Sequence, residues 1–383
     1  MSFLFNYLLL GLIGGVVSSL TFGPVRVSLL DVATATLLIG WVIAKGKKIV
    51  PAVDPLLRVA GPFLFVALLS LVVAGFRLSI TELLTAALYL VRFAVFLVLL
   101  VIVSTTVELK KSVRFGLLIS GMVIALLGFL QYFLYPNLRN LSYLGWDPHE
   151  FRLFSSFFDP NFTGILLVLT IILVFITRIH HRKIVNLVWV GVLILLLIAL
   201  LLTYSRGSYV ALVVVGAVFA LKERQFKWLL IGGSVFLLTL VLLPRPGGEG
   251  VRLLRTMSIS SRIDNSVEAI RLWRTSPLIG VGFNTIRYVR SAPPENLIQI
   301  ENAHSAAGFH NSYLFLLVTV GIIGFVCFFW MGKKLWELVE VRHRQLLGLT
   351  VLAIGIHSLF DNSLFYPPVL VWLSVLWGGS IRD

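Results

Sequence analysis

The sequence predicts an all-α, polytopic membrane protein: a single integral membrane domain over residues 1–383 with about twelve transmembrane helices. Apolar runs of about twenty residues recur from end to end of the chain. Only 13% of the residues are charged, whereas a soluble protein of this length carries about a quarter. The alternating segments of about ten residues that are typical of a membrane β-barrel do not occur.

The apolar runs place the predicted spans to within about two to four residues. The spans are 3–22, 28–44, 55–75, 82–104, 115–134, 161–177, 184–203, 208–221, 226–243, 311–332, 345–360 and 364–380. No Lys or Arg precedes the first span and no small-residue cleavage site follows it, so we expect a retained helix rather than a signal peptide. The lone cysteine, Cys327, excludes an internal disulfide and a cysteine metal site.

The basic residues sort between the two sides of the membrane. If the N-terminus is cytoplasmic, the cytoplasmic segments hold Lys45, Lys47, Lys48, Lys110, Lys111, Arg114, Arg178, Arg182, Lys183, Lys222, Arg224, Lys227, Lys333, Lys334, Arg342, Arg344 and Arg382. The short outside loops hold Arg26, Arg77, Arg139, Arg152 and Arg206. This bias predicts a multi-pass membrane protein, surrounded by membrane lipids, with both termini in the cytoplasm. The net charge of +15 therefore does not indicate a nucleic-acid partner.

Two longer segments fall on the outer side of the membrane, at 135–160 and 244–310. We expect the second, between the ninth and tenth helices, to carry part of the active site, because a loop of this size normally has a function of its own. Its basic residues are all arginines: Arg245, Arg252, Arg255, Arg262, Arg271, Arg274, Arg287 and Arg290. Arginine offers phosphate a planar fork and keeps its charge, so this composition favours phosphate binding.

Inside this loop, the stretch SSRIDNSVEAIRLWRTSP (260–277) predicts a helix. Ser261 and Asp264 fit a capping box, and Pro277 follows as a stop. Three aliphatic side chains share one face: Ile263, Val267 and Ile270. Arg262 would lie in the first turn, where free backbone N–H groups and the helix dipole already favour an anion.

The stretch LLTYSRGSYVAL (201–212) places Arg206 between two apolar runs at the outer membrane surface. Gly207 would permit a tight reversal between the seventh and eighth helices. Arg206 is either an anion-binding cation or an arginine at a helix end whose head group reaches the interface, which is common.

The stretch HNSYLFLLVTVGIIGF (310–325) opens the tenth span with His310 and Asn311. A helix N-terminus favours the neutral imidazole, which can accept a proton from a hydroxyl. The alternative is an interfacial or capping histidine. His304, six residues earlier, has no comparable context.

The stretch FRLFSSFFDPNFTGILL (151–167) opens the sixth span. Asp159 and Asn161 fit ordinary helix capping around a proline, whereas Arg152 lies on the same outer face as Arg206. Arg58 and Arg92 fall within spans, and Arg92 fits a structural ion pair as well as a place on the substrate path.

Other catalytic motifs do not occur. The chain has no paired carboxylates in sequence, no histidine cluster at metal-ligand spacing, no Walker loop and no G-x-S-x-G. Acidic residues are scarce on the outer side, so we expect neither a metal site nor a cofactor.

The motifs TYSRG, SR…EAIRLWRTSPLIGVGFNT and HNSYL…GIIG, in this order, resemble the O-antigen ligase and Wzy polymerase superfamily. The resemblance is strongest over about residues 185–340. It implies a GT-C-like membrane glycosyltransferase that works without metal or nucleotide sugar. Two periplasmic arginines and a histidine are the key residues of the ligases, and these positions match Arg206, Arg262 and His310.

The resemblance implies that a glycan passes from undecaprenyl pyrophosphate to an acceptor hydroxyl, on lipid A–core or on a growing glycan. Arg206 would bind the diphosphate, Arg262 would stabilise charge on the leaving pyrophosphate, and His310 would deprotonate or orient the hydroxyl. A single displacement would invert the stereochemistry. To substrate binding we further assign Arg152, Arg271 and Asn311.

Alternatives remain within and beyond this chemistry. Polymerases of the superfamily often have R-x10-G motifs in two outside loops; Arg271 to Gly282 fits this spacing, and Arg152 to Gly164 misses it by one residue. A protein O-oligosaccharyltransferase would use the same chemistry. The rival class is a bicarbonate or other anion transporter, which should show internal repeats and broken helices near the midplane.

Overall fold

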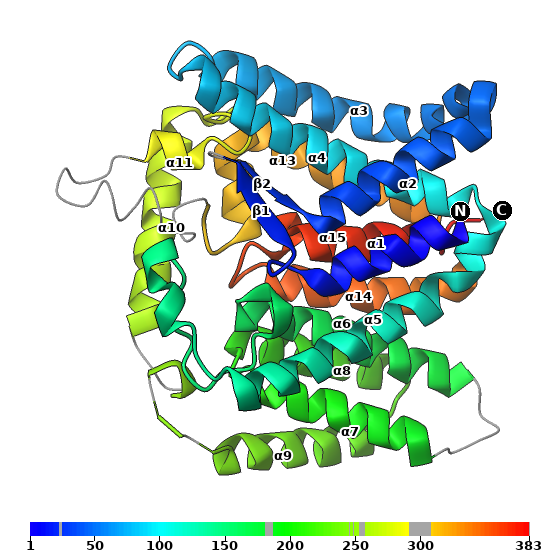
Figure 1. Ribbon diagram of the computed structural model, residues 1–383, viewed down its shortest axis with the longest axis vertical. Helices are drawn as coiled ribbons and strands as arrows, with labels where there is room; N and C mark the ends of the chain where they lie inside the picture. Colours follow the sequence, from blue (N-terminus) through cyan, green and yellow to red (C-terminus); the bar gives the residue numbers. More distant parts are fainter. Residues whose placement is uncertain are drawn as a thin grey trace.

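Apolar helices make up almost all of the computed structural model, which describes residues 1–22, 25–180, 187–244, 246–247, 249–252, 257–290 and 308–382 (Figure 1). The helices are α1 (Ser2–Gly14), α2 (Leu29–Lys45), α3 (Ile49–Ala74), α4 (Ile80–Ser104), α5 (Val107–Leu134), α6 (Pro160–His180), α7 (Leu187–Leu202), α8 (Arg206–Lys222), α9 (Phe226–Leu242), α10 (Met257–Thr275), α11 (Ile286–Val289), α13 (Ser312–Glu337), α14 (Arg344–His357) and α15 (Pro367–Gly378). The two strands are β1 (Ser19–Phe22) and β2 (Val25–Ser28).

The prediction of a polytopic helical membrane protein is confirmed. Within the described residues, five helical stretches have the length and hydropathy to cross a membrane: the continuous run 29–74, α4, α5, residues 160–177 of α6, and α13. Each predicted span overlaps a helix, although several of these helices are shorter than a bilayer is thick.

Polar residues beside the apolar runs fix where helices begin. Ser28 and Asp31 form a capping box at the start of α2, and Ser79 and Glu82 form a second one at α4. Asn311 caps α13. Each cap supplies acceptors for backbone N–H groups that the first helical turn leaves unpaired.

The first predicted span is wrong in its second half. Helix α1 ends at Gly14, and β1 then pairs antiparallel with β2, with Ser19 opposite Ser28. The chain between α1 and β1 is tied to another loop, because the Val16 and Val17 N–H groups donate to the Ser156 carbonyl. Residues 15–22 are apolar enough to continue a helical run, so hydropathy did not separate this hairpin from the span.

Helix α13 is broken at Gly321, which has φ 63°. The segment 277–282 fills the break. Its carbonyls accept from the N–H groups of residues 322–323, and its own N–H groups donate to the carbonyls of residues 318–319, at 2.9 to 3.2 Å. A Cβ at position 321 would lie 2.2 Å from the Leu278 carbonyl oxygen, so only glycine fits there. The loop that follows α10 is thereby held in place by backbone hydrogen bonds.

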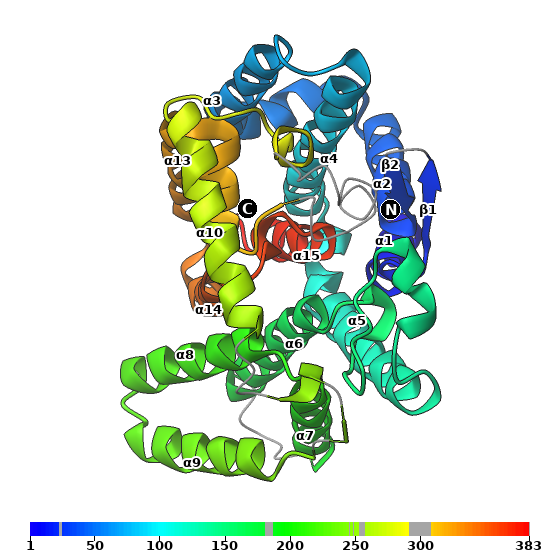
Figure 2. The same ribbon diagram turned by 90° about the vertical axis from the view of Figure 1, so that its left-hand side faces the viewer.

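The hairpin and α10 lie at the opposite end of the bundle from the two chain termini (Figure 1). Viewed onto that end, α10 runs across the face of the bundle beside α13 and towards α14 and α8 (Figure 2). The candidate site lies at this end.

Candidate functional site

Four segments that are far apart in sequence meet at the end of the bundle that carries α10. They are the start of α8, the first half of α10, the start of α13 and the turn after α14. Hydrogen bonds join the last three of these segments: the Ser312 N–H donates to the Ser358 carbonyl at 2.9 Å, and the Asn311 side-chain amide donates to the Leu359 carbonyl at 3.3 Å. The His310 N–H donates to Asn265 Oδ1 of α10 at 2.9 Å. His310 is therefore positioned by α10 and α14 as well as by its own helix.

Asp361, in the turn after α14, joins two of the predicted catalytic residues. Its carboxylate lies 3.3 Å from an Arg262 nitrogen and 3.5 Å from His310 Nδ1. The Asp361 side chain is only 6% exposed, whereas that of His310 is 40% exposed. The carboxylate is therefore buried beneath a histidine that reaches the open space of the site.

Asp361 remains ionised in spite of its burial. Burial alone would raise the pKa of Asp361, but the hydrogen bond with His310 and the positive charge of Arg262 hold this pKa below its ordinary value. A buried carboxylate between a cation and an imidazole neutralises the cation and orients the ring. Sequence reasoning missed Asp361, because no local motif surrounds it and it lies 51 positions after His310.

Arg206, the first residue of α8, lies near enough to Arg262 for their like charges to interact. Its position depends on a close packing of α8 against α14. A Cβ at Gly207 would lie 3.2 Å from the Phe360 side chain and 3.4 Å from that of His357. The expected tight reversal at Gly207 is wrong: the positive φ of the turn is at Tyr204, with φ 50°. Gly207 instead allows close contact between helices.

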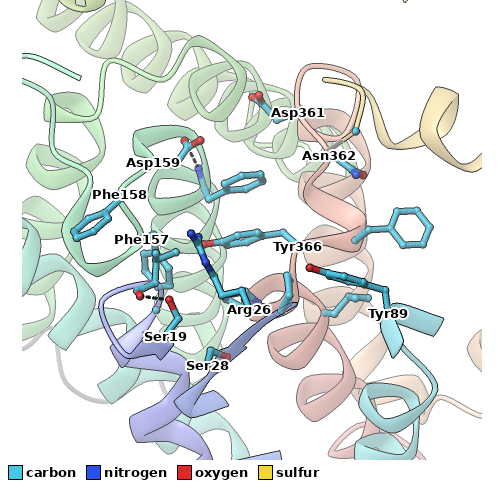
Figure 3. A pocket seen from close by; sticks show the side chains of 18 of the residues that line it. Ser19, Arg26, Ser28, Tyr89, Phe157, Phe158, Asp159, Asp361, Asn362 and Tyr366 are labelled. Atoms are coloured by element: carbon cyan, nitrogen blue, oxygen red, sulfur yellow. Dashed lines mark hydrogen bonds between the residues drawn. The ribbon is translucent and has the colours of Figure 1, made fainter. Parts of the chain in front are cut away.

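A cavity of about 450 Å³ opens beside His310 and Asp361. Its lining comes from the hairpin, α4, the loop before α6, the loop before α13 and the start of α15. Figure 3 shows Arg26, Tyr89, Asp159, Asp361 and Tyr366 around it. Most of its surface is aromatic or apolar with a few polar groups, as is usual for a small-molecule site.

Four carboxylates line this cavity: Asp31, Asp147, Asp159 and Asp361. Asp159 and Asp361 lie close enough for their negative charges to interact. Asp159 accepts the Asn161 N–H at 2.6 Å and so caps α6, which confirms the expected capping role. Burial raises the pKa of Asp159 to about 6, and the negative charge of Asp361 adds to the effect. The sequence showed no carboxylate pair because these two residues are about 200 positions apart.

The three further binding residues have other surroundings. Arg152 is buried, and its Nε donates to the Thr203 carbonyl at 2.9 Å, so it supports the turn before Arg206 from below. The Asn311 side chain accepts two N–H groups of α13. Arg271 is exposed on α10, and nine residues along a helix place it about 180° around the axis from Arg262. The structure brings none of the three to the cavity lining.

Helix α10 differs from its prediction at its start. It begins at Met257, so Arg262 lies in the second turn and not beside free N–H groups. The aliphatic face is solvent-accessible, with Ile263 57% and Val267 61% exposed. The opposite face, which carries Arg262 and Asn265, packs towards α13. Five of the basic residues and histidines named from the sequence lie outside the described residues: Arg182, Lys183, Arg245, Arg255 and His304.

The two arginines within spans are both ion-paired. Arg92 bonds to Asp31 at 2.8 Å and also lines the cavity, so its two proposed roles are not exclusive. Arg58 pairs with Asp54 one turn away on the exposed face of α3. Within the part of the chain that the structure describes, no three His, Cys, Asp or Glu side chains form a group that could hold a metal ion.

Residues 191–329 match the Wzy_C family model, described as O-antigen ligase. The chain thus carries an O-antigen ligase family domain over this stretch, as the sequence motifs indicated. The domain extends from α7 into α13 and contains Arg206, Arg262 and His310. Asp361 lies outside it. No curated protein matches the sequence.

Proposed function

We propose that this protein transfers a glycan from undecaprenyl pyrophosphate to an acceptor hydroxyl at the periplasmic face of the bacterial inner membrane, as an O-antigen ligase does. One observation carries the proposal: within and beside an O-antigen ligase domain, Arg262 and His310 meet on the buried Asp361 carboxylate at a cavity. This arrangement supplies a cation, a base and an orienting group within a few ångströms.

The donor diphosphate would bind near Arg206 and Arg262. Two arginines close enough to repel each other are stabilised by an anion between them. As the bond between the anomeric carbon and the diphosphate oxygen breaks, negative charge grows on the leaving group. Arg262, held in place by Asp361, would stabilise that charge without rearranging.

His310 would accept the proton of the acceptor hydroxyl. Its Nδ1 faces Asp361, so Nδ1 carries the hydrogen and Nε2 is left to act as the base. The acceptor oxygen then attacks the anomeric carbon in one displacement, which inverts the configuration. Three of the four cavity carboxylates have partners: Asp31 is paired with Arg92, Asp361 with Arg262 and His310, and Asp159 with the N-terminus of α6. These three are therefore not presented as nucleophiles.

The break in helix α13 gives little support to the transporter hypothesis. The backbone groups freed at Gly321 of α13 are paired with the segment 277–282. A transporter uses such groups to coordinate an ion or substrate, whereas here another part of the chain occupies them. Polymerisation onto a growing glycan would need the same base and arginines, so the choice between ligase and polymerase depends on the acceptor.

The proposal includes a GT-C-type topology with twelve spans and cytoplasmic termini. Three segments would lie in the periplasm: the hairpin, residues 135–160 and residues 244–310. The loop 244–310 would carry Arg262 and His310. The charge bias of the loops and the opposite placement of hairpin and termini (Figure 1) support it.

The test is transfer in proteoliposomes. Purified protein would be mixed with an undecaprenyl-pyrophosphate glycan and either lipid A–core or a second lipid-linked repeat unit, and the products separated on a gel. Transfer to lipid A–core supports a ligase, and chain growth supports a polymerase. No transfer to either acceptor, together with transport of bicarbonate into vesicles, would overturn the proposal.

A further inference from the structure

One side of the cavity combines an arginine with aromatic rings. We call it the hairpin wall: Arg26 of β2, Tyr89 of α4, Trp146 of the loop before α6, and Tyr366 at the start of α15. Figure 3 shows Arg26 extending from the hairpin towards Tyr366, away from the strand that carries it. Sequence analysis gave Arg26 no role beyond the charge bias.

Arg26 is held in a defined position by the span beneath it. The Arg92 guanidinium donates to the Arg26 carbonyl at 2.6 Å and to Asp31 at 2.8 Å. Asp31 in turn closes the capping box of α2 with Ser28, the last residue of β2. The Arg92 and Asp31 side chains are only 20% and 17% exposed. A pair of this kind is costly in a membrane unless it has a function, and here it fixes the strand that presents Arg26.

The Arg26 side chain lies in a setting suited to an anion. Its guanidinium carbon is 5.3 Å from the centre of the Trp146 ring. Burial lowers the pKa of Arg26. The nearby Tyr89 and Tyr366 oppose this effect, whereas the positive charge of Arg287 lowers the pKa further. Arg287 contributes a second cation nearby, and its Nε is buried without a hydrogen-bond partner among the described residues. Two partly desolvated arginines strengthen binding of a negative group.

Three of the four carboxylates that line the cavity have partners of their own, and the fourth, Asp147, is exposed. Asp31 is paired with Arg92, Asp361 with Arg262 and His310, and Asp159 with backbone N–H groups of α6. Each aromatic ring of the wall already has one partner, Arg26 on Trp146, Arg92 on Tyr89 and Phe162 on Tyr366. The rings also line the cavity, where their remaining apolar surface is of the kind that ligand pockets use for stacking, and the two faces of a sugar ring are largely apolar C–H groups. A sugar with one anionic substituent matches both features.

We propose that the hairpin wall is the acceptor-sugar subsite and that Arg26 selects an acceptor bearing a carboxylate or phosphate substituent. The inference rests on the proposed glycosyl transfer, since His310 and the hairpin wall line one cavity and the sugar that presents its hydroxyl to His310 must lie in it. Arg206 and Arg262 would hold the donor diphosphate, so the two anionic groups of the reaction have separate arginines.

Binding of single sugars tests the subsite directly. Saturation-transfer NMR on the purified full-length protein in detergent would compare methyl glucoside, methyl glucuronide and glucose 6-phosphate. We expect the better anionic probe to bind about tenfold more tightly than the neutral one, as a charge-assisted bidentate contact provides. Whichever anionic probe binds identifies the substituent as carboxylate or phosphate.

Variants make the assignment specific. Arg26→Gln should remove the preference for the anionic probe, and Arg26→Lys should keep part of it. The control is Arg77→Gln, the same change at an exposed arginine near the start of α4, which should bind all probes as the wild type does. Elution of each variant as a single peak on size exclusion establishes folding. Equal binding of the neutral and anionic probes to the wild type, or an unchanged preference in Arg26→Gln, overturns the proposal.

The transfer assay separates this inference from the proposed function. If the wild type transfers glycan and Arg26→Gln still discriminates between acidic and neutral acceptors, the subsite is wrong and the transferase stands. If the wild type transfers nothing but binds anionic sugars through Arg26, the subsite stands and the transferase is wrong.

Discussion

The guanidinium of Arg262 lies 3.3 Å from the carboxylate of Asp361, which ties α10 to the turn after α14. One turn further along α10, Asn265 accepts the N–H of His310 at 2.9 Å. Helix α10 therefore contributes one residue to the leaving-group side of the proposed reaction and positions the residue on the base side. A shift of α10 would disturb both sides together, which suits a site where charge stabilisation and proton transfer must occur in one step.

Loss of either proposed diphosphate arginine should abolish transfer. Arg206→Ala and Arg262→Ala are expected to lower the transfer rate by about 10²- to 10³-fold, because each removes a charge from the developing anion. Lysine should restore only part of the activity, since a point charge replaces a bidentate fork. The measurement is gel-based transfer at matched amounts of membrane-inserted protein. Arg271→Ala, on the opposite face of α10, is the control and should keep most of its activity.

His310→Ala should lose transfer while the lipid-linked donor still binds, because both arginines remain. Loss of a general base typically costs about 10²- to 10⁴-fold in rate. His304→Ala should be much milder. Unchanged transfer by His310→Ala would show that another group takes the proton.

Asp361→Asn should act through His310 and Arg262 and not through substrate contact. The amide keeps the shape of the carboxylate but cannot neutralise Arg262 or hold the imidazole in one tautomer. We expect kcat to fall by about 10²-fold or more and the pH profile of transfer to shift, with little change in the KM for the donor. A residue with only a packing role would lower the yield of folded protein and leave the pH profile unchanged. Asp147→Asn, at an exposed carboxylate of the same cavity, is the matched control.

Hydropathy was enough to predict where most helices lie, because an apolar run of this length has few alternatives. They failed where tertiary hydrogen bonds decide the structure. The hairpin at 19–28 depends on pairing between strands. The break at Gly321 depends on the backbone of the segment 277–282, which no local pattern of α13 reveals.

The candidate site was predictable where a motif or a helix end marks the residue. His310 and Arg262 were identified in this way, and both contact one carboxylate. Arg152 and Arg271 were assigned by their side of the membrane, a criterion that gives no direction for a side chain. Arg152 points into the protein, and Arg271 points away from the site. Asp361 is the opposite case, because no motif marks it in the sequence. It lies in a turn, and only long-range packing brings it into contact with Arg262 and His310.

Asp159 should make stability depend on pH in an unusual sense. Its pKa is about 6 in the folded protein and about 3.8 in an unconstrained chain, so the folded state binds the proton more tightly. Stability is therefore greatest below about pH 4 with respect to this group, declines as the pH rises to about 6, and stays reduced above that value. Asp159→Asn keeps an oxygen to cap α6 and removes the buried charge. We expect it to stabilise the protein by roughly 3 kcal/mol at pH 7.5 and by almost nothing at pH 4, as measured by unfolding in detergent. An equal difference at both pH values would show that burial of the charge is not the cause.

The proposed topology can be tested by thiol labelling in whole cells. In a Cys327→Ser background, a cysteine at Ser260, exposed on α10, should react with an impermeant reagent once the outer membrane has been made permeable. A cysteine at Ser112, exposed near the start of α5, should react only after the inner membrane is opened, because Lys110, Lys111 and Arg114 place that segment in the cytoplasm. The two positions carry the same substitution and similar exposure, so accessibility of the side chain does not explain a difference between them. Labelling in the reverse order would show that the protein has the opposite orientation in the membrane. The arginines and His310 would then face the cytoplasm, away from the periplasmic face at which the proposed transfer takes place.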